Sequence, residues 1–344
     1  MAQKPPENQP SFETQLESGL KRLVGAGQGL LLAVSGGRDS MAMLHGVVNL
    51  RRTLGIPELA VAHLNHGLRG EFGRRDAEFV RSQCEGLGVP VVTSDCRTGE
   101  LERSSRGSLE EAARNARYEF LQTTARQRGL PLIVTAHHAS DQAETVLHNI
   151  LRGTGLRGLR GIPERRQLDV YLALIRPMLT IKADIISNYV QLNDIPFASD
   201  ETNADSDFTR NRLRHQLIPR LQEDFNAQIA DSLVRLAAQS QELLQGLDAV
   251  ADTLLMAAML EQTPDLCRLD VTKLRSHAEP IVRHALTVLW IRQNWPRRDM
   301  SRDHMVRLTS MLMLGTPSAI DLPGGVRAEL RGNLLVLQMG PLRR

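Results

Sequence analysis

Short apolar runs alternate with amphipathic segments along the first half of the chain. The apolar runs predict strands at 29–37, 58–67, 90–96 and 131–138. Each run is followed by a segment with the apolar spacing of a helix, at 39–55, 72–87, 108–129 and 140–153. Buried strands that alternate with helices of about a dozen or more residues form parallel sheets covered on both faces. The pattern therefore predicts the α/β fold class, with a doubly wound parallel sheet.

The pattern differs on both sides of this alternating region. Residues 1–28 combine a polar, proline-rich start, expected to be a mobile tail, with an amphipathic helix from about Phe12 to Val24. Further along the chain, helical patterns follow at 225–262, 280–293 and 300–314. Pro-Gly-Gly and Arg-Gly-Asn then punctuate short strands within 319–338. We therefore expect a second, all-α domain over 223–344 that ends in a short hairpin.

Composition places the chain among ordinary globular proteins. Its 344 residues are 42% apolar and 24% charged, which argues against disorder and against a fibrous repeat. No run approaches the ~18 apolar residues of a membrane span, and the start of the chain lacks the apolar stretch of a signal peptide. The three cysteines, Cys84, Cys96 and Cys267, are too widely spaced for a C-x-x-C metal or redox site. We therefore expect a cytoplasmic protein without membrane contact and without thiolate chemistry.

The excess of basic residues lies in one middle segment. Residues 151–220 carry 11 basic and 8 acidic groups, whereas the segments before and after are balanced, so this segment accounts for the whole net charge of +3. Its arginines cluster at 152–166 and again at 210–214. Such clusters suit a phosphate backbone, although solvated loops and helix faces explain charge runs of this kind about equally well.

The segment AVSGGRDS, at 33–40, joins the first strand of the predicted sheet to the helix that follows it, where α/β proteins bind nucleotides. Its two glycines let the backbone approach an oxyanion without an intervening Cβ. The next amides lie at a helix N-terminus, where unpaired N–H groups attract phosphate. Two serine hydroxyls can add hydrogen bonds, and Asp39 can cap the helix or reach a metal ion on the phosphates. The candidate nucleotide-binding residues are Ser35, Gly36, Gly37, Arg38, Asp39 and Ser40.

This loop differs from the two commonest nucleotide-binding loops. It has no lysine of the G-x-x-x-x-G-K-[ST] pattern and does not match G-x-G-x-x-G. A plain strand-to-helix turn is the alternative explanation for two adjacent glycines. SGGRDS instead resembles the S-G-G-x-D-S loop of the N-type ATP pyrophosphatases, the PP-loop superfamily. The resemblance implies that ATP is split between its α- and β-phosphates and that AMP is transferred to an oxygen.

Two further stretches bring histidines and arginines toward the same edge of the predicted sheet. HLNHGLRG ends the second strand with His63 and His66. EEAARNARYEFL puts Arg114, Arg117 and Tyr118 on one face of a helix. Taken alone, the histidines could cap a strand end and the arginines could pair with neighbouring glutamates.

The stretch TAHHASDQAETVLHNILRGTGLRGLRGIP, at 135–163, joins a strand end, a helix and a Gly/Arg-rich loop. In that helix Asp141 and Glu144 are three residues apart and share a face, with His137 and His138 just before it. Acidic residues favour the first turn of any helix, so an exposed helix start is the alternative. If the strand ends meet, however, these side chains converge on the glycine loop.

Together these motifs closely resemble those of the tRNA(Ile)-lysidine synthetase family. The family patterns are S-G-G-x-D-S, H-x-N-H-x-L-R, E-E-A-A-R-x-x-R-Y, H-H-x-D-D-Q-x-E-T and R-N-x-[IL]-R, the last present as TRNRLRHQLIP at 209–219. The resemblance is dense over 29–222, which it implies is a PP-loop ATP-binding catalytic domain. Ser140 departs from it, because the family pattern has two aspartates there. The family often carries a further C-terminal domain, of which we expect at most a part here.

The resemblance implies a ligase that joins L-lysine to C2 of the wobble cytidine in the CAU anticodon of tRNA(Ile), through an adenylated cytidine and with release of AMP and pyrophosphate. ATP and Mg²⁺ are the implied cofactors, with Asp39 as a metal ligand. Asp141 and Glu144 are implied to recognise lysine and remove its proton, with His137 and Arg117 beside them. The implied contacts to tRNA or phosphate are Arg114, Arg157, Arg160, Arg210, Arg212 and Arg214.

Two other functions share part of this pattern. A tRNA-thiolating enzyme of the same superfamily also adenylates a base carbonyl, but it needs a cysteine pair or an iron–sulfur cluster that the three cysteines do not offer. A non-catalytic nucleotide sensor with a helical interaction domain needs neither Asp141 nor Glu144. Pyrophosphate release that requires both tRNA and lysine separates the three. The sequence leaves open the number of metal ions, the oligomeric state, for which a homodimer is one option, and the roles of His63, His66 and His138.

Overall fold

The computed structural model divides into two compact units, Met1–Gln239 and Ser240–Arg344. The boundary falls inside one long helix, α11, which spans Ile229–Ala258. The structure describes residues 10–65, 71–96, 109–198, 208–297 and 299–340. His66 and nearly all of the tail expected at the start of the chain lie outside these ranges.

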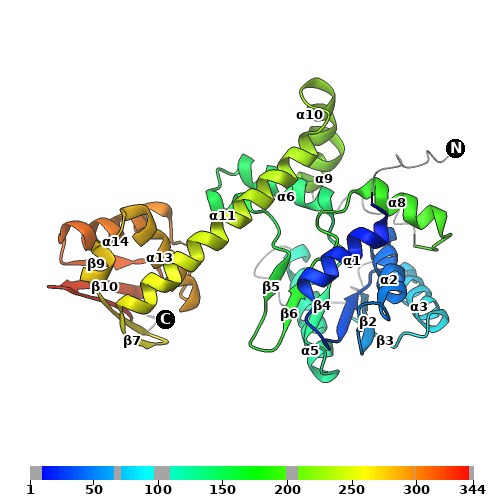
Figure 1. The fold of residues 1–344 in the computed structure, drawn as a ribbon, viewed down its shortest axis with the longest axis horizontal. Coiled ribbons are helices and arrows are strands. Elements are labelled where there is room, and N and C mark those ends of the chain that lie inside the picture. The colour runs from blue at the N-terminus through cyan, green and yellow to red at the C-terminus, as the bar shows by residue number, and fades with distance from the viewer. Residues whose placement is uncertain (1–9, 66–70, 97–108, 199–207, 298, 341–344) are drawn as a thin grey trace. The chain divides into compact units, whose positions relative to one another are not determined.

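The first unit is built on a six-stranded sheet with the order β3-β2-β1-β4-β6-β5 (Figure 1). Its strands are β1 Leu30–Ala33, β2 Leu59–Asn65, β3 Val91–Asp95, β4 Leu132–Val134, β5 Arg165–Gln167 and β6 Ala173–Ile175. All neighbouring pairs are parallel except β5 and β6. Every side chain of β1 is buried, as expected for a central strand covered on both faces. The predicted doubly wound sheet is confirmed, and β5 and β6 are additions that the pattern did not indicate.

Helices cover both faces of this sheet. They are α1 Phe12–Leu23, α2 Arg38–Leu50, α3 Glu71–Gly86, α5 Leu109–Gln127, α6 Ala139–Leu151, α7 Leu156–Leu159 and α8 Ala183–Leu192. Leu30 and Leu32 pack with α1, α2 and α8 in one core cluster, whereas Leu31 and Ala33 pack with α5 in another. Because successive side chains of a strand point to opposite faces, α2 and α5 lie on opposite sides of the sheet.

A further apolar cluster holds the segment after α8 against α6. This segment consists of α9 Phe208–Arg212, a π-helix η1 at Leu213–Leu217, and α10 Ile218–Asp224. Leu213 and Ile218 are buried against Ala143 and Val146 of α6, together with Leu233 of α11. π-Helical turns are rare and occur frequently at functional sites. The packing brings the arginines of this segment to the first turns of α6.

The second unit contains a five-stranded antiparallel sheet with the order β7-β8-β11-β10-β9. Its elements after α11 are β7 Met259–Thr263, β8 Leu266–Asp270, α12 Val271–Arg275, α13 Glu279–Arg292, α14 Arg302–Leu314, β9 Ala319–Leu322, the 3-10 turn η2 Pro323–Gly325, β10 Val326–Arg331 and β11 Leu334–Met339. The expected hairpin is present as β10 and β11, but the expectation of an all-α domain is wrong. β7 is an exposed edge strand that continues the apparent helix 225–262. β8 pairs on one side with β7 in a hairpin and on the other side with the distant β11.

Within the described ranges, no helix combines the length and apolar character needed to cross a bilayer. The cytoplasmic location expected from the sequence stays a prediction.

Candidate active site

The loop between β1 and α2 is shaped to expose backbone N–H groups. Gly36 has a φ of 94°, in the left-handed region that glycine adopts without strain. Its carbonyl oxygen accepts a hydrogen bond of 3.0 Å from the Ala198 amide, so a residue distant in the sequence helps to fix the loop. α2 begins after Gly37, and no side chain of the described residues caps its N-terminus. The first amides of α2 are therefore open to an anion.

Two serines hold this loop in shape. The Ser35 amide donates to Ser40 Oγ at 3.2 Å, and the two hydroxyl oxygens lie 3.1 Å apart. The buried Ser40 hydroxyl donates to the Gly37 carbonyl oxygen at 2.8 Å. We expected both hydroxyls to serve a phosphate, whereas the structure uses the Ser40 proton to close the loop on itself. The exposed Ser35 hydroxyl is the one that faces solvent.

His138 links the loop after β1 to helix α6 after β4. β1 and β4 are neighbours where the strand order reverses, which is the point where α/β sheets bind ligands. His138 Nδ1 accepts the Ser140 amide at 3.2 Å, so its Nε2 carries the proton. Nε2 lies 3.4 Å from Asp39 Oδ2 and 3.7 Å from Asp141 Oδ2. A buried histidine thus connects the carboxylate of the glycine loop to the first carboxylate of α6.

The two aspartates control the acid–base state of His138. Burial works to lower the pKa of His138, but the hydrogen bond to Asp39 and the charge of Asp141 outweigh burial and raise it above 6.5. Asp39 shows the matching shift: burial works against it, yet His138 and Arg38 lower its pKa. The two carboxylates therefore raise the pKa of His138 and hold its Nε2–H between them.

We expect His138 to stabilise the fold more strongly below its raised pKa than above it. A raised pKa contributes stability that is complete below the ordinary value of 6.5 and is lost as pH rises through the folded-state value. The difference in free energy of unfolding between the native chain and His138→Asn should therefore shrink above pH 6.5, by at most about 1.4 kcal/mol per pH unit. Urea unfolding at a series of pH values measures this difference. A constant difference from about pH 6 to about pH 9 would contradict the assignment.

Glu144 is a deeply buried carboxylate, with 1% of its surface exposed. Arg214 contacts both carboxylates of α6: its Nε lies 2.5 Å from Glu144 Oε1 and its Nη2 lies 2.9 Å from Asp141 Oδ1. Arg210 Nε lies 3.7 Å from Glu144 Oε2, an oxygen that accepts no hydrogen bond from the described residues. Burial raises the pKa of Glu144, although Arg214 works against this shift.

Two arginines of the α9–η1 segment, Arg210 and Arg214, contact the carboxylates of α6. Opposite charges at such distances offset part of the penalty of burying a carboxylate. The Arg212 side chain is exposed, as is that of Arg214. A role of Arg210, Arg212 and Arg214 toward tRNA or phosphate stays a prediction. Arg214 could take this role only if its guanidinium left Asp141 and Glu144.

His137 lies among cations and is neutral. Burial lowers the pKa of His137 to about 3, and Arg176 and Arg117 reinforce this shift against the opposing charge of Asp141. Thr135 Oγ1 lies 2.9 Å from His137 Nδ1 and orients the ring. Because an uncharged imidazole can still donate or accept a hydrogen bond, His137 can contact a reacting group without adding charge.

Arg176 belongs to this group and was not singled out from the sequence. It directly follows the apolar strand β6, so its position at the carboxyl edge of the sheet was the signal that could have revealed it. It is 4% exposed, and its Nη1 donates to the Pro163 carbonyl oxygen at 2.7 Å. Its Nε is buried and has no hydrogen-bond partner among the described residues. His63, at the end of β2, instead donates through Nδ1 to the Val34 carbonyl oxygen at 2.9 Å and braces the neighbouring strand.

Gln142 fastens the Gly/Arg-rich loop to α6. Its Nε2 donates to the carbonyl oxygens of Arg160 and Ile162, both at 3.1 Å, and its Oε1 accepts the Ile162 amide at 2.6 Å. Asn149 Nδ2 adds a hydrogen bond of 2.8 Å to the Gly158 carbonyl oxygen. The loop that carries Arg157 and Arg160 is therefore held in one conformation, with both side chains partly exposed.

Replacing Gln142 with Ala should lower the free energy of unfolding by about 2 kcal/mol, because several hydrogen bonds of a buried side chain are lost together. Chemical denaturation measures the change. Gln127→Ala, at an exposed position near the end of α5, is the matched control and should shift the free energy by less than about 0.5 kcal/mol. Equal effects of the two variants would show that Gln142 does not fasten the loop.

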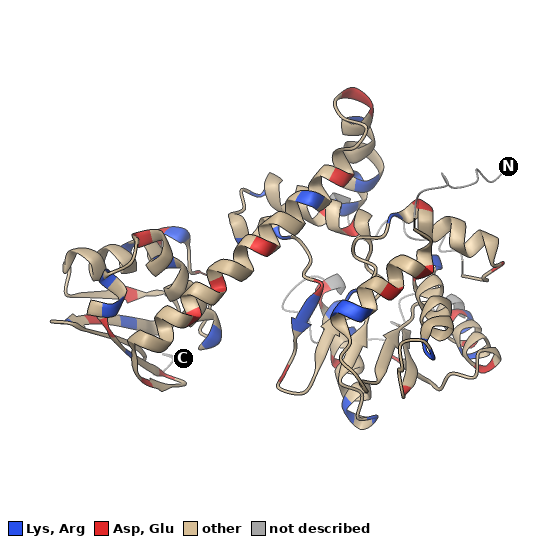
Figure 2. Ribbon diagram, viewed as in Figure 1, with Lys and Arg blue, Asp and Glu red and all other residues tan. Residues whose placement is uncertain are grey.

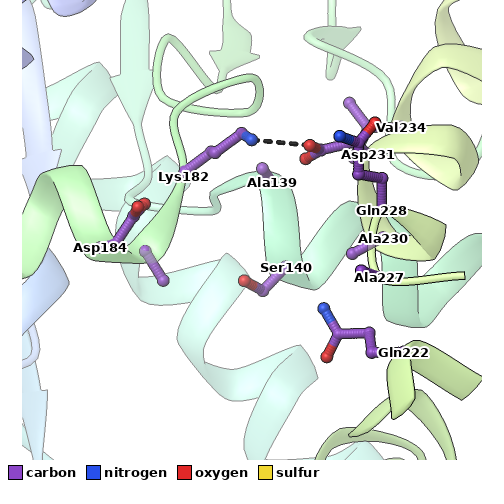
Figure 3. Close-up of a pocket in the computed structure, with 11 residues that line it drawn as sticks. Ala139, Ser140, Lys182, Asp184, Gln222, Ala227, Gln228, Ala230, Asp231 and Val234 are labelled. Atoms are coloured by element: carbon purple, nitrogen blue, oxygen red, sulfur yellow. Dashed lines mark hydrogen bonds and ion pairs between the residues drawn. The ribbon is translucent and has the colours of Figure 1, made fainter. Parts of the chain in front are cut away.

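A pocket of about 280 Å³ opens beside the N-terminus of α6 (Figure 3). Lys182 Nζ and Asp231 Oδ2 form an ion pair of 2.6 Å in its wall. Ser140 also lines this pocket. The departure from the two-aspartate pattern at position 140 therefore changes the wall of the pocket, while Asp141 keeps its contact with His138.

Known proteins were compared with this chain. Residues 8–221 match the model of the PP-loop domain family. A tRNA(Ile)-lysidine synthase of Thermotoga maritima is 40% identical over 212 residues, which cover 62% of this chain and 49% of that protein. Another, from Chlorobaculum tepidum, is 37% identical over 237 residues, which cover 69% of this chain and 70% of that protein. The structure of the U34-tRNA thiolase NcsA from Methanococcus maripaludis, with 15% identity and a TM-score of 0.56 over 67% of this chain and 77% of its own, shows a likeness of fold.

The strand order, the glycine loop at the point of reversal and the domain match together define a PP-loop protein. Within that class the chain belongs to the tRNA(Ile)-lysidine synthase family. The family expected from the motifs is thereby confirmed. The chain spans about half the length of the Thermotoga maritima relative, 49%.

Proposed function

We propose that this chain ligates L-lysine to C2 of the wobble cytidine, position 34, in the CAU anticodon of tRNA(Ile). ATP adenylates the C2 oxygen and releases pyrophosphate, and the amine of lysine then displaces AMP. The relatives from Thermotoga maritima and Chlorobaculum tepidum carry the name of this activity. The contact of His138 with Asp39 and Asp141 is the observation that supports the proposal most directly, because it joins the glycine loop and the α6 carboxylates in one site.

The glycine loop supports the adenylation step. The open amides at the start of α2 and the Ser35 hydroxyl suit the outer phosphates of ATP. Esterification of the cytosine oxygen to phosphate converts a poor leaving group into a good one and divides one difficult substitution into two easier steps. Arg117 and Arg176, at the same edge of the sheet, are positive groups that can offset charge at the reacting phosphate.

Mg²⁺ enters the proposal as a companion of ATP. Among the residues that the structure describes, no three His, Cys, Asp or Glu side chains gather to hold a metal ion by themselves. Mg²⁺ at phosphoryl-transfer sites is commonly held by one or two carboxylates together with the substrate phosphates. Asp39 and Asp141, both in contact with His138, fit this pattern and would hold the ion. The ion would offset negative charge on the phosphates.

The two carboxylates of α6 support the lysine step. An amine of lysine is protonated near neutral pH, so it must lose a proton before it can attack. The raised pKa of Glu144, caused first by burial, makes this carboxylate a stronger base than an exposed one. The guanidinium of Arg214 shows that the oxygens of Asp141 and Glu144 can hold a cation together, and the ammonium of lysine would meet these same oxygens.

An assay with purified chain, ATP, radiolabelled lysine and unmodified tRNA(Ile) tests the proposal. We expect incorporation of lysine into tRNA, with pyrophosphate released when ATP and tRNA are present. AMP should be released only when lysine is present as well, in an amount equal to the lysine incorporated. Formation of ADP, or no incorporation by folded protein, would reject the proposal.

A thiolating enzyme is the competing function. Burial raises the pKa of Cys84 and of Cys267 to about 11, so neither thiol ionises readily near neutral pH. These two thiols are therefore poorly suited to a thiolating reaction. Incorporation of sulfur instead of lysine in the same assay would reverse this choice.

A further inference from the structure

A second hollow, of about 270 Å³, lies between helix α5 and strand β5. Its polar lining consists of Arg114, Asn115, Tyr118, Glu119, Gln122 and Arg166. The steps proposed for ATP and lysine use neither Arg166 nor Gln122. The hollow therefore needs an explanation of its own.

Two guanidinium groups in this hollow have no carboxylate partner among the described residues. Within the described ranges, neither Arg114 nor Arg166 forms an ion pair. Arg114 lies over the ring of Tyr118, 5.6 Å from the ring centroid, which directs its guanidinium along the aromatic surface. Figure 2 shows the basic stretch on β5. Because Glu119 is the one carboxylate of the lining, the hollow carries a net positive charge.

The surroundings of the hollow add to this positive potential. Burial works to raise the pKa of Tyr118, yet the charges of Arg114, Arg176 and Arg117 lower it overall. Two of these arginines also act on His137 in the active site. The hollow and the reaction centre thus share the positive potential of the same arginines. A positive potential of this extent attracts a polyanion.

The phosphates of ATP are not the anion that the hollow fits. α5 packs on Leu31 and Ala33, whereas α2, which presents its amides to phosphate, packs on Leu30 and Leu32. The hollow and the body of α2 are therefore on opposite faces of the sheet. A second phosphate-bearing molecule suits this hollow, and RNA provides phosphates at regular intervals next to the base that reacts.

We propose that this hollow binds a backbone phosphodiester of the anticodon strand, with Arg114 and Arg166 as its cationic contacts. The amides of Asn115 and Gln122 can donate to the sugar or to a base edge beside that phosphate. The inference rests on the proposed function for the identity of the RNA. Free pyrophosphate offers the same chemistry, so the experiment separates the two sources.

Binding of unmodified tRNA(Ile), without ATP, is measured at several salt concentrations for Arg114→Gln and Arg166→Gln. Each variant should raise Kd roughly tenfold and reduce the slope of log Kd against log salt by about 0.7, the value for one lost phosphate contact on a single strand. Arg128→Gln removes the same charge from an exposed position just after α5, outside the hollow, and should change neither quantity. Thermal unfolding confirms that all three variants are folded.

Two outcomes would overturn the inference. Folded variants with unchanged Kd and unchanged salt slope would show that the hollow does not contact tRNA. Weaker inhibition by pyrophosphate, with tRNA binding unaffected, would assign the hollow to free pyrophosphate. Incorporation of lysine by the native chain is measured separately, so its absence together with Arg166-dependent tRNA binding would reject the ligase activity and leave this site in place.

Discussion

Replacing Glu144 with Gln is expected to stop lysine transfer while adenylation of tRNA continues. Glutamine keeps the shape of the side chain but cannot accept a proton, so the rate of lysidine formation should fall roughly 100-fold or more. Pyrophosphate release and adenylated tRNA, followed with radiolabelled ATP, report the first step, and lysine incorporation reports the second. The residual rate should rise with pH, because free lysine amine forms without a base near its own pKa of about 10.4.

Glu85→Gln is the matched control for this variant, since Glu85 is exposed on α3. Both steps should keep their native rates in the control. If Glu144→Gln slows pyrophosphate release as strongly as lysine transfer, the carboxylate acts in adenylation and the assignment to the second step is wrong.

Replacing Gly36 with Ala should reduce every ATP-dependent step by roughly 100-fold. An alanine at this position would have to keep the left-handed backbone conformation, at φ 94°, which costs about 1–3 kcal/mol. It would also lie 3.3 Å from Val80 Cγ2, a contact tighter than ordinary packing. The loop would shift, and the amides of α2 would no longer point at one common anion. The KM for ATP and the rate of pyrophosphate release measure the loss.

Gly55→Ala separates backbone strain from loss of the site. Gly55 also has a positive φ, 61°, but a Cβ there meets nothing within 4 Å, and the residue follows α2 rather than preceding it. This control should lose stability in thermal unfolding and keep its KM for ATP. Similar kinetic losses in both variants would mean that general destabilisation, and not the glycine loop, explains the effect of Gly36→Ala.

The predictability of the fold depended on how far each strand was buried. β1, β2 and β4 are almost wholly apolar because helices cover both faces, so their runs were visible in the sequence. β5 has three exposed polar residues and pairs in the sheet only with β6, which leaves no apolar signal. β7 and β8 of the second unit were missed for a related reason, because β7 is exposed along most of its length and β8 lies between β7 and the distant β11.

The candidate site was predictable where residues lie at strand ends. Parallel strands bring their carboxyl ends to one edge, so the loop after β1 and the start of α6 after β4 had to be close. The choice between neighbouring histidines was not predictable: His138, rather than His137, contacts Asp39 and Asp141. The neighbouring charges then separate the two, because arginines reinforce the lowered pKa of His137 whereas two aspartates raise the pKa of His138.

The sequence alone therefore determined the parallel sheet, the glycine loop that suits phosphate and the family, because periodicity and local motifs need only near neighbours in the chain. Tertiary structure decided which charges meet. The pairing of Arg214 with Glu144, the three hydrogen bonds of Gln142 and the hollow between α5 and β5 join segments far apart in sequence. Such contacts depend on burial and on the partner that packing supplies, and neither can be predicted from a single stretch of residues.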